Sequence, residues 1–199
     1  MYNLEEGKKL VLFARRNIEN YLKLRKNIEI EEIPDSFKKN CGVFVTLHTY
    51  PLNNLRGCIG YPEPVLPLID ALLDASVSSA TRDPRFPRVR YEEMKNIVIE
   101  VTVLTPPELV KAQKPDQYPS LIKVGVDGLI IELGFRKGLL LPQVPVEERW
   151  DEEEFLSHTC IKAGLSKDCW MDKNSLIYKF QGQIFSETKP EGEIIEKKS

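Results

Sequence analysis

The stretch Ile97-Val-Ile-Glu-Val-Thr-Val-Leu104 constrains the fold more than any other part of this sequence. It is rich in the β-branched residues that favour strands. Because side chains alternate between the two faces of a strand, four β-branched residues share one face and Glu100 lies on the other, among apolar neighbours. A carboxylate buried on such a strand needs a partner. We expect Arg56 to be that partner, either in a structural ion pair or in a functional site.

Hydrophobic periodicity predicts several further elements. A capping box of Asn3 and Glu6 opens one helix, and a similar pair, Asp151 and Glu154, opens another. Helical spacing covers residues 4–26, 65–80 and 151–163. Strand patterns cover residues 42–47, 55–60, 129–133, 139–141 and 175–186, the first two as a hairpin. Gln143 is expected on the loop that leaves the strand at 139–141, and a crossover or lobe boundary near residues 105–120.

The segment Leu55-Arg-Gly-Cys-Ile-Gly60 is the strongest candidate for a functional site. In an extended segment Arg56 and Cys58 project to one face, and a neighbouring cation favours the thiolate. Gly57 and Gly60 lack a Cβ, so backbone or ligand can approach the sulfur closely. The alternative is that the glycines serve a turn or bulge and that Cys58 is a small buried hydrophobe.

A second candidate is the irregular stretch Thr81-Arg-Asp-Pro-Arg-Phe-Pro-Arg88. Its two prolines forbid continued helix, which leaves its side chains on an accessible segment. Three arginines and Phe86 suit an anionic ligand through ion pairing and stacking. In the alternative interpretation Asp83 caps a turn of an ordered corner and Phe86 fills the core.

Composition narrows the class of protein. The 199 residues fit one domain, or one domain with a smaller lobe, and the net charge of −2 argues against a chain-wide electrostatic grip on nucleic acid, although a local basic patch is allowed. No apolar run approaches the roughly 20 residues that a spanning helix needs, and the first residues do not read as a secretory signal. We therefore expect a cytoplasmic protein that does not associate with membranes. Residues 187–199 form a charged tail that we expect to be loose or docked by few contacts.

The cysteines and histidines show no metal-binding spacing. There is no C-x-x-C pair and no H-x-x-x-H among Cys41, Cys58, Cys160, Cys169, His48 and His158, so a structural zinc site is not expected. In a reducing cytosol the four cysteines are most simply free thiols. Helical spacing puts Cys160 on an apolar face, where packing is its default role. Neither a phosphate-loop pattern nor a dinucleotide glycine fingerprint occurs, so no cofactor is identified.

Six segments in this order closely resemble the AMMECR family, which is named for a human Alport-syndrome, midface-hypoplasia and elliptocytosis region. They are Gly42-Val-Phe-Val-Thr-Leu, Leu55-Arg-Gly-Cys-Ile-Gly, Asp83-Pro-Arg-Phe, Ile99-Glu-Val-Thr-Val-Leu-Thr-Pro-Pro-Glu108, Leu140-Leu-Pro-Gln-Val144 and Cys160-Ile-Lys-Ala-Gly-Leu165. The match covers roughly residues 42–185, and the glycine-bounded Leu55–Gly60 segment is its most specific part.

The resemblance implies a single α/β chain in which a mainly antiparallel or mixed sheet is flanked by helices. It also implies a larger lobe and a smaller lobe within residues 1–186, with the Leu55–Gly60 segment near a cleft between them. Carried over residue by residue, the matching positions are Arg56, Gly57, Cys58, Gly60, Asp83, Phe86, Glu100, Gln143, Cys160 and Lys162. His48 matches no motif of the family and is not assigned as a base.

Three functions are compatible with these residues. In the first, Cys58 is a catalytic thiol, Arg56 holds the thiolate or a substrate anion, Glu100 orients Arg56 or moves a proton, and Gln143 donates to a polarised oxygen. The remaining family positions, Gly57, Gly60, Asp83, Phe86, Cys160 and Lys162, would then contact the ligand.

The second function is a non-catalytic module that binds a nucleotide, RNA or another small anionic ligand through the local arginines. The third is an accessory subunit that works with Memo-like and radical S-adenosylmethionine proteins, a role that only the resemblance implies. The sequence does not define a substrate or an oligomeric state.

Overall fold

The computed structural model describes residues 2–197 and divides the chain into two compact units. The first unit contains the residues up to Leu104 and the stretch from Gln183 onward, and the second unit contains Thr105–Gly182. Strand β7 (Leu176–Glu187) therefore begins in the second unit and ends in the first. The architecture is the expected mixture of helices and antiparallel sheet.

The first unit is built on a sheet in which β1 is central. β1 (Val43–Thr49) pairs antiparallel with β2 (Leu55–Tyr61) on one side and with β3 (Ile97–Leu104) on the other. The end of β7 lies next to β3 and also pairs with β8 (Ile194–Lys197). The hairpin and the strand at 97–104 are thus confirmed.

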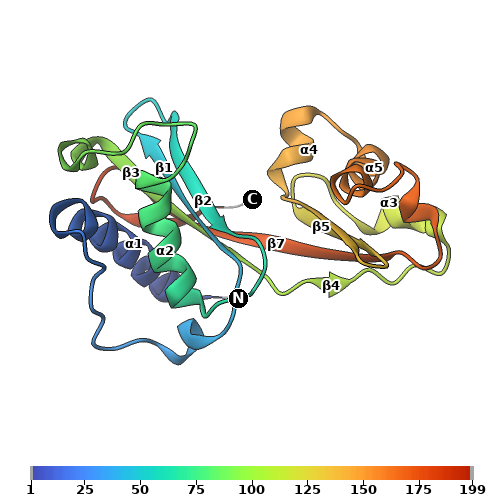
Figure 1. Cartoon of the computed structure of the whole chain (residues 1–199), viewed down its shortest axis with the longest axis horizontal. Helices are drawn as coiled ribbons and strands as arrows, with labels where there is room; N and C mark the ends of the chain where they lie inside the picture. The colour runs from blue at the N-terminus through green and yellow to red at the C-terminus, as the bar shows by residue number, and fades with distance from the viewer. Residues whose placement is uncertain (1, 198–199) are drawn as a thin grey trace. The chain divides into compact units, whose positions relative to one another are not determined.

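Two helices cover one face of this sheet. α1 (Leu4–Leu24) begins at the expected capping box, and α2 (Leu68–Thr81) follows β2. Figure 1 shows both helices against this sheet. Their apolar side chains form one buried cluster with alternate residues of β1 and β3, such as Val45, Leu47 and Ile99. The short turns η1 (Asp35–Lys38) and η2 (Tyr91–Asn96) complete the unit. Because side chains alternate along each strand, the sheet face opposite the helices carries other residues, among them the polar side chains of Thr46, Cys58 and Glu100.

A buried ion pair fixes α1 to the sheet. The guanidinium of Arg15 contacts the Glu187 carboxylate at the end of β7 at 2.5 and 2.6 Å, and the two side chains are 5% and 1% exposed. Arg15 also donates to the carbonyl of Ile97, and Glu187 accepts from the backbone amide of Ile99. Because these groups satisfy each other, two charges can be buried between α1, β3 and β7.

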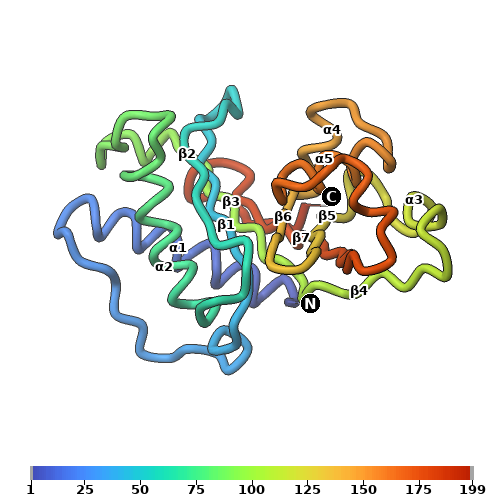
Figure 2. The backbone as a smooth tube through the Cα atoms, turned by 45° about the vertical axis from the view of Figure 1, so that its right-hand side comes forward, coloured from blue at the N-terminus to red at the C-terminus, as the bar shows by residue number. Residues whose placement is uncertain are grey.

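The second unit has its own sheet and its own core. β5 (Asp127–Leu133) pairs with β6 (Arg136–Leu140) and with the first half of β7, and β4 (Glu108–Leu109) pairs with β7. Figure 2 shows α5 (Glu152–Lys162) beside β5 and β6. The remaining elements are η3 (Pro115–Gln117), α3 (Tyr118–Leu121), α4 (Gln143–Glu148) and η4 (Cys169–Met171). α5 starts at the expected capping box of Asp151 and Glu154.

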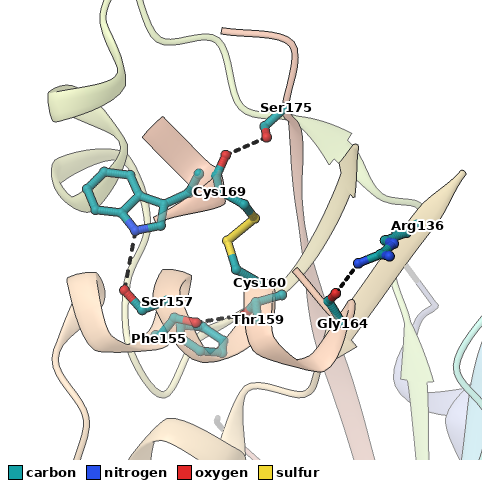
Figure 3. The surroundings of a disulfide bond; sticks show 9 residues. Arg136, Phe155, Ser157, Thr159, Cys160, Gly164, Cys169 and Ser175 are labelled. Atoms are coloured by element: carbon teal, nitrogen blue, oxygen red, sulfur yellow. Dashed lines mark hydrogen bonds between the residues drawn. A yellow bond between two sulfur atoms is a disulfide. The ribbon is translucent and has the colours of Figure 1, made fainter. Parts of the chain in front are cut away.

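The second unit contains a disulfide, so the expectation of four free thiols is wrong. Cys160 of α5 is bonded to Cys169 of η4, and both are buried in the core of this unit (Figure 3). Nearby, Ser175 donates to the carbonyl of Cys169, and the indole of Trp170 donates to Ser157. The two cysteines are nine positions apart, a spacing that carries no motif, which is why the sequence did not reveal the bond. Cys41 and Cys58 are free.

The charged tail is also more ordered than expected. Ile194–Lys197 form β8, which pairs with residues 184–187 of β7. Ile194 is 7% exposed and belongs to the core of the first unit, so one apolar residue anchors an otherwise charged segment. Among the described residues, no helix combines the length and the apolar character needed to cross a membrane.

Replacing Arg15 by leucine should destabilise the protein strongly, because the buried Glu187 carboxylate would lose its cation. The expected loss in the free energy of unfolding is about 3–5 kcal/mol, measured by urea denaturation. Arg16→Leu, at the exposed neighbouring position of the same helix, is the matched control and should change stability little. Equal effects of the two substitutions would contradict a specific role for the ion pair.

Candidate functional site

Three polar side chains form a row across β2, β1 and β3, on the face opposite the helices. Thr46 of β1 pairs with Cys58 of β2 on one side and with Glu100 of β3 on the other. The Thr46 hydroxyl donates to the Cys58 sulfur at 3.2 Å, and the Glu100 side chain is 15% exposed. We call Cys58, Thr46 and Glu100 the three-strand row. All three are only partly buried, so each retains some access to solvent.

The thiol of Cys58 is not activated by Arg56. Burial raises the pKa of Cys58, the hydrogen bond from Thr46 and the charge of Arg85 lower it, and the carboxylates of Asp83 and Glu100 raise it. The guanidinium of Arg56 instead contacts the Glu93 carboxylate of η2 at 3.1 Å and the carbonyl of Pro87 at 2.9 Å. The net direction is upward, so the thiol is predominantly protonated at neutral pH.

Asp83 and Arg85 hold the outer edge of β2. The Asp83 carboxylate accepts from the backbone amide of Cys58 at 2.8 Å, and Arg85 donates to the carbonyl of the same residue at 3.3 Å. The two side chains also form an ion pair at 2.8 Å. Together they act as a neighbouring strand would, because they satisfy the donor and the acceptor that Cys58 presents at the sheet edge. This contact positions the cysteine through its backbone.

The same corner contains the expected turn. Asp83 accepts from the backbone amide of Arg85, so the prediction that Asp83 caps a turn is confirmed. The Arg85 guanidinium holds the pKa of Asp83 well below its usual range, with burial opposing and the backbone amides of Cys58 and Arg85 assisting. Phe86 is half-buried, carries Arg85 over its ring at 5.5 Å and does not belong to the buried core.

The glycines of β2 serve packing. A Cβ at Gly57 would overlap the carbonyl oxygen of Ser79 in α2, and one at Gly60 would overlap the carbonyl oxygen of Val43 in β1. The absence of side chains at these positions therefore lets α2 and β1 lie close to β2. Gly57 faces the helix, which places Cys58 on the opposite face by strand alternation.

Glu100 has partners other than the expected Arg56. Its Oε2 atom accepts from the Lys197 ammonium of β8 at 2.6 Å, and its Oε1 atom lies 3.9 Å from Nε2 of His48. Burial raises the pKa of Glu100, but the hydrogen bonds and charges of His48 and Lys197 outweigh it, so the pKa is lowered. The sequence favours Arg56 only if its strand adjoins that of Glu100, and in the sheet β1 lies between the two strands. Lys197 was missed because residues 187–199 gave no strand signal.

The structure also adds Thr46 and His48 to the site. They follow each other on one face of β1, a relation that strand alternation could have indicated once their strand was predicted. Nδ1 of His48 is buried and has no hydrogen-bond partner among the described residues. No group of three or more histidine, cysteine, aspartate or glutamate side chains within residues 2–197 is arranged to hold a metal ion.

The other predicted site residues belong to the second unit. Gln143 is exposed and is the first residue of α4. It was expected on the loop after the strand at 139–141, and it lies instead in the helix that follows that loop. Lys162 is exposed at the end of α5. Cys160 is fully buried in its disulfide, which rules it out as a free thiol ligand.

Comparisons with known proteins identify the relatives of this chain. The AMMECR1 family model matches residues 11–185. A protein of Methanocaldococcus jannaschii is 58% identical over 198 residues, covering 100% of this chain and 98% of that protein. A protein of Methanothermobacter thermautotrophicus is 56% identical over 184 residues, covering 92% and 95% of the two chains.

One solved structure has the same fold. The crystal structure of an uncharacterised protein from Pyrococcus horikoshii is 53% identical to this chain, with a TM-score of 0.83, and covers 99% of this chain and 98% of its own.

The lowered pKa of Asp83 predicts how its contribution to stability depends on pH. Because the folded-state pKa lies below the unfolded-state value, the contribution is present above about pH 4 and is lost as the pH falls through the folded-state pKa. Asp83→Asn should therefore lower Tm at pH 7, and the difference from the wild type should shrink toward pH 2. Glu92→Gln, at an exposed carboxylate of η2, is the control. A constant difference across this range would contradict the assignment.

Proposed function

This chain belongs to the AMMECR1 family, and from that premise we propose that the three-strand row binds a small polar ligand in which Cys58 acts as an uncharged thiol. The family relatives reported above supply no reaction or substrate, so the proposal rests on the chemistry of the row. The observation that carries it is the register of β1. It places a thiol, a hydroxyl and an ionised carboxylate on one sheet face, in direct succession across three strands.

Such a row offers complementary hydrogen-bonding groups to one small molecule. A neutral thiol is a weak donor, the threonine hydroxyl can donate or accept, and the Glu100 carboxylate only accepts. The strands fix the spacing of these groups, so a ligand would meet a preorganised site rather than flexible loops. Partial burial strengthens each interaction, since polar contacts are stronger in a lower dielectric than in water.

A thiolate mechanism has less support. A cysteine nucleophile normally has a lowered pKa or an adjacent base. Here burial raises the pKa of Cys58, and among the described residues the groups that act on it include no imidazole. The Arg56 guanidinium, the expected activator, is engaged by Glu93 and Pro87.

Binding of RNA or a nucleotide through the arginines at residues 82–90, which we call the arginine corner, also has less support. Arg82 lies 3.4 Å from Asp74, Arg85 lies 2.8 Å from Asp83, and Arg90 lies 3.7 Å from Glu93. Local carboxylates thus offset much of the positive charge that a phosphate would need. An accessory role beside Memo-like or radical S-adenosylmethionine proteins is compatible with a ligand site in this chain. That role rests on family resemblance alone.

The pH dependence of alkylation by iodoacetamide tests the state of the thiol. Mass spectrometry should show Cys58 reacting more slowly at pH 7 than a cysteine in an unfolded peptide, with a rate that still rises above about pH 9. Arg85→Ala should slow the reaction further, because that cation lowers the thiol pKa. Arg56→Ala should leave the profile unchanged. Fast reaction at pH 7 that depends on Arg56 would instead establish an activated nucleophile.

Protection from the same reagent tests ligand binding. A pool of small polar metabolites, fractionated by charge, should contain a fraction that slows alkylation of Cys58 in the wild type. Thr46→Val keeps the shape of the side chain but removes the hydroxyl, and it should weaken this protection. Alkylation of Cys41, the other free cysteine, is the internal control. Absence of protection by every fraction would contradict the proposal.

A further inference from the structure

The Glu100 carboxylate is the charged member of the three-strand row. Its surroundings restrict which chemical groups of a ligand it can bind. It is 15% exposed and its charged form is stabilised by cations. The groups that face it are Thr46 and His48 from β1, Cys58 from β2 and Lys197 from β8. Of these, Lys197 is the side chain that brings a permanent positive charge.

The contact between Glu100 and Lys197 differs from the buried ion pair of Arg15 and Glu187 in the same unit. Arg15 and Glu187 are both buried, and further donors and acceptors on β3 complete their hydrogen bonding. The Lys197 side chain is 38% exposed, and within residues 2–197 its ammonium makes one hydrogen bond, to an oxygen of the Glu100 carboxylate. This ammonium is flexible and regains its hydration when it leaves, and a ligand cation that takes its place spares Glu100 the cost of a buried, unpaired charge.

The Lys197 side chain can move while the backbone of β8 stays in place. β8 has four residues and pairs with β7, and its buried anchor is Ile194, at the opposite end of the strand. Movement of the Lys197 ammonium therefore requires rotation of its side chain and no loss of core packing. Glu100, in contrast, stays fixed by its place in the central strands.

We propose that Glu100 recognises a primary ammonium group of the ligand and that the Lys197 ammonium occupies this position until the ligand replaces it. This inference rests on the proposed function, because it assigns a ligand class to the same row. A half-buried carboxylate needs a cation, and an amine supplies the same charge and the same donors as the lysine that it displaces. Atoms next to the amine would then contact the Thr46 hydroxyl and the Cys58 thiol.

The test uses n-propylamine as the probe and n-propanol as its uncharged analogue. Binding is followed by ¹H–¹⁵N NMR shifts of the Thr46, Cys58 and Glu100 amides at pH 7. Lys197→Met keeps the apolar stem but removes the competing ammonium, so it should bind n-propylamine about tenfold more tightly than the wild type. Glu100→Gln should abolish the response, and n-propanol should cause none.

A matched control separates this competition from a general change in charge. Lys38→Met removes a lysine from an exposed ion pair with Asp35 in the same unit, and it should bind the amine as the wild type does. The double variant Glu100→Gln/Lys197→Met removes both charges, so it should remain folded and show no amine response even where Lys197→Met alone is unstable.

The outcomes distinguish this inference from the proposed function. Equal amine affinity of the wild type and Lys197→Met, or an equal response to n-propanol, overturns the ammonium assignment. If Cys58 is nevertheless protected by an anionic or neutral metabolite fraction, the three-strand row remains a ligand site with another specificity. If no fraction protects Cys58 and no amine binds, both proposals fail.

Discussion

The antiparallel register of β1 between β2 and β3 is the constraint on which the candidate site depends. It aligns Thr46 with Cys58 on one side and with Glu100 on the other. The same register directs Val45 and Leu47 into the core beneath the helices. A slip of one residue would exchange the two faces, so the packing that stabilises the first unit also fixes the polar row.

Close packing on the helical side reinforces this register. Gly57 lets β2 approach Ser79 of α2, and the ion pair of Arg15 and Glu187 ties α1 to the other edge of the same core. Neither contact involves the row directly. They hold the strands in place, and the strands set the spacing of Cys58, Thr46 and Glu100 in the proposed ligand site.

Two ion pairs of the first unit, Arg15–Glu187 and Lys197–Glu100, show how similar charges can serve different purposes. Arg15 and Glu187 are buried and fully bonded, so breaking them should cost stability. Lys197 is partly exposed and contacts one oxygen of the Glu100 carboxylate, which is the basis for the proposal that a ligand ammonium replaces it. This contrast is the physical reason for assigning structure to the first pair and recognition to the second.

The sequence predicted the elements well where the signals are local. Alternation over residues 97–104 gave β3, and the capping boxes at Asn3 and Asp151 gave the starts of α1 and α5. The family motifs selected Cys58 and Glu100 as candidate site residues, and the register of β1 places both on one sheet face with Thr46 between them.

Side-chain partners distant in sequence were not predictable in the same way. Arg56 forms an ion pair with Glu93 of the short helix η2. Glu100 forms one with Lys197 of β8, a strand without apolar periodicity. The bond between Cys160 and Cys169 joins a helix to an adjacent turn, and no local pattern marks it. These contacts depend on tertiary packing, and they cannot be predicted from the composition of the sequence or the spacing of its residues.

The most direct test of the central claim is a ¹H–¹⁵N NMR map of the labelled protein with the metabolite fraction that protects Cys58. The account predicts that the largest shift changes cluster at Thr46, Cys58 and Glu100 and decline with distance along β1, β2 and β3. Changes centred on Gln143 and Lys162, or on the arginine corner at residues 82–90, with the three-strand row unaffected, would contradict it.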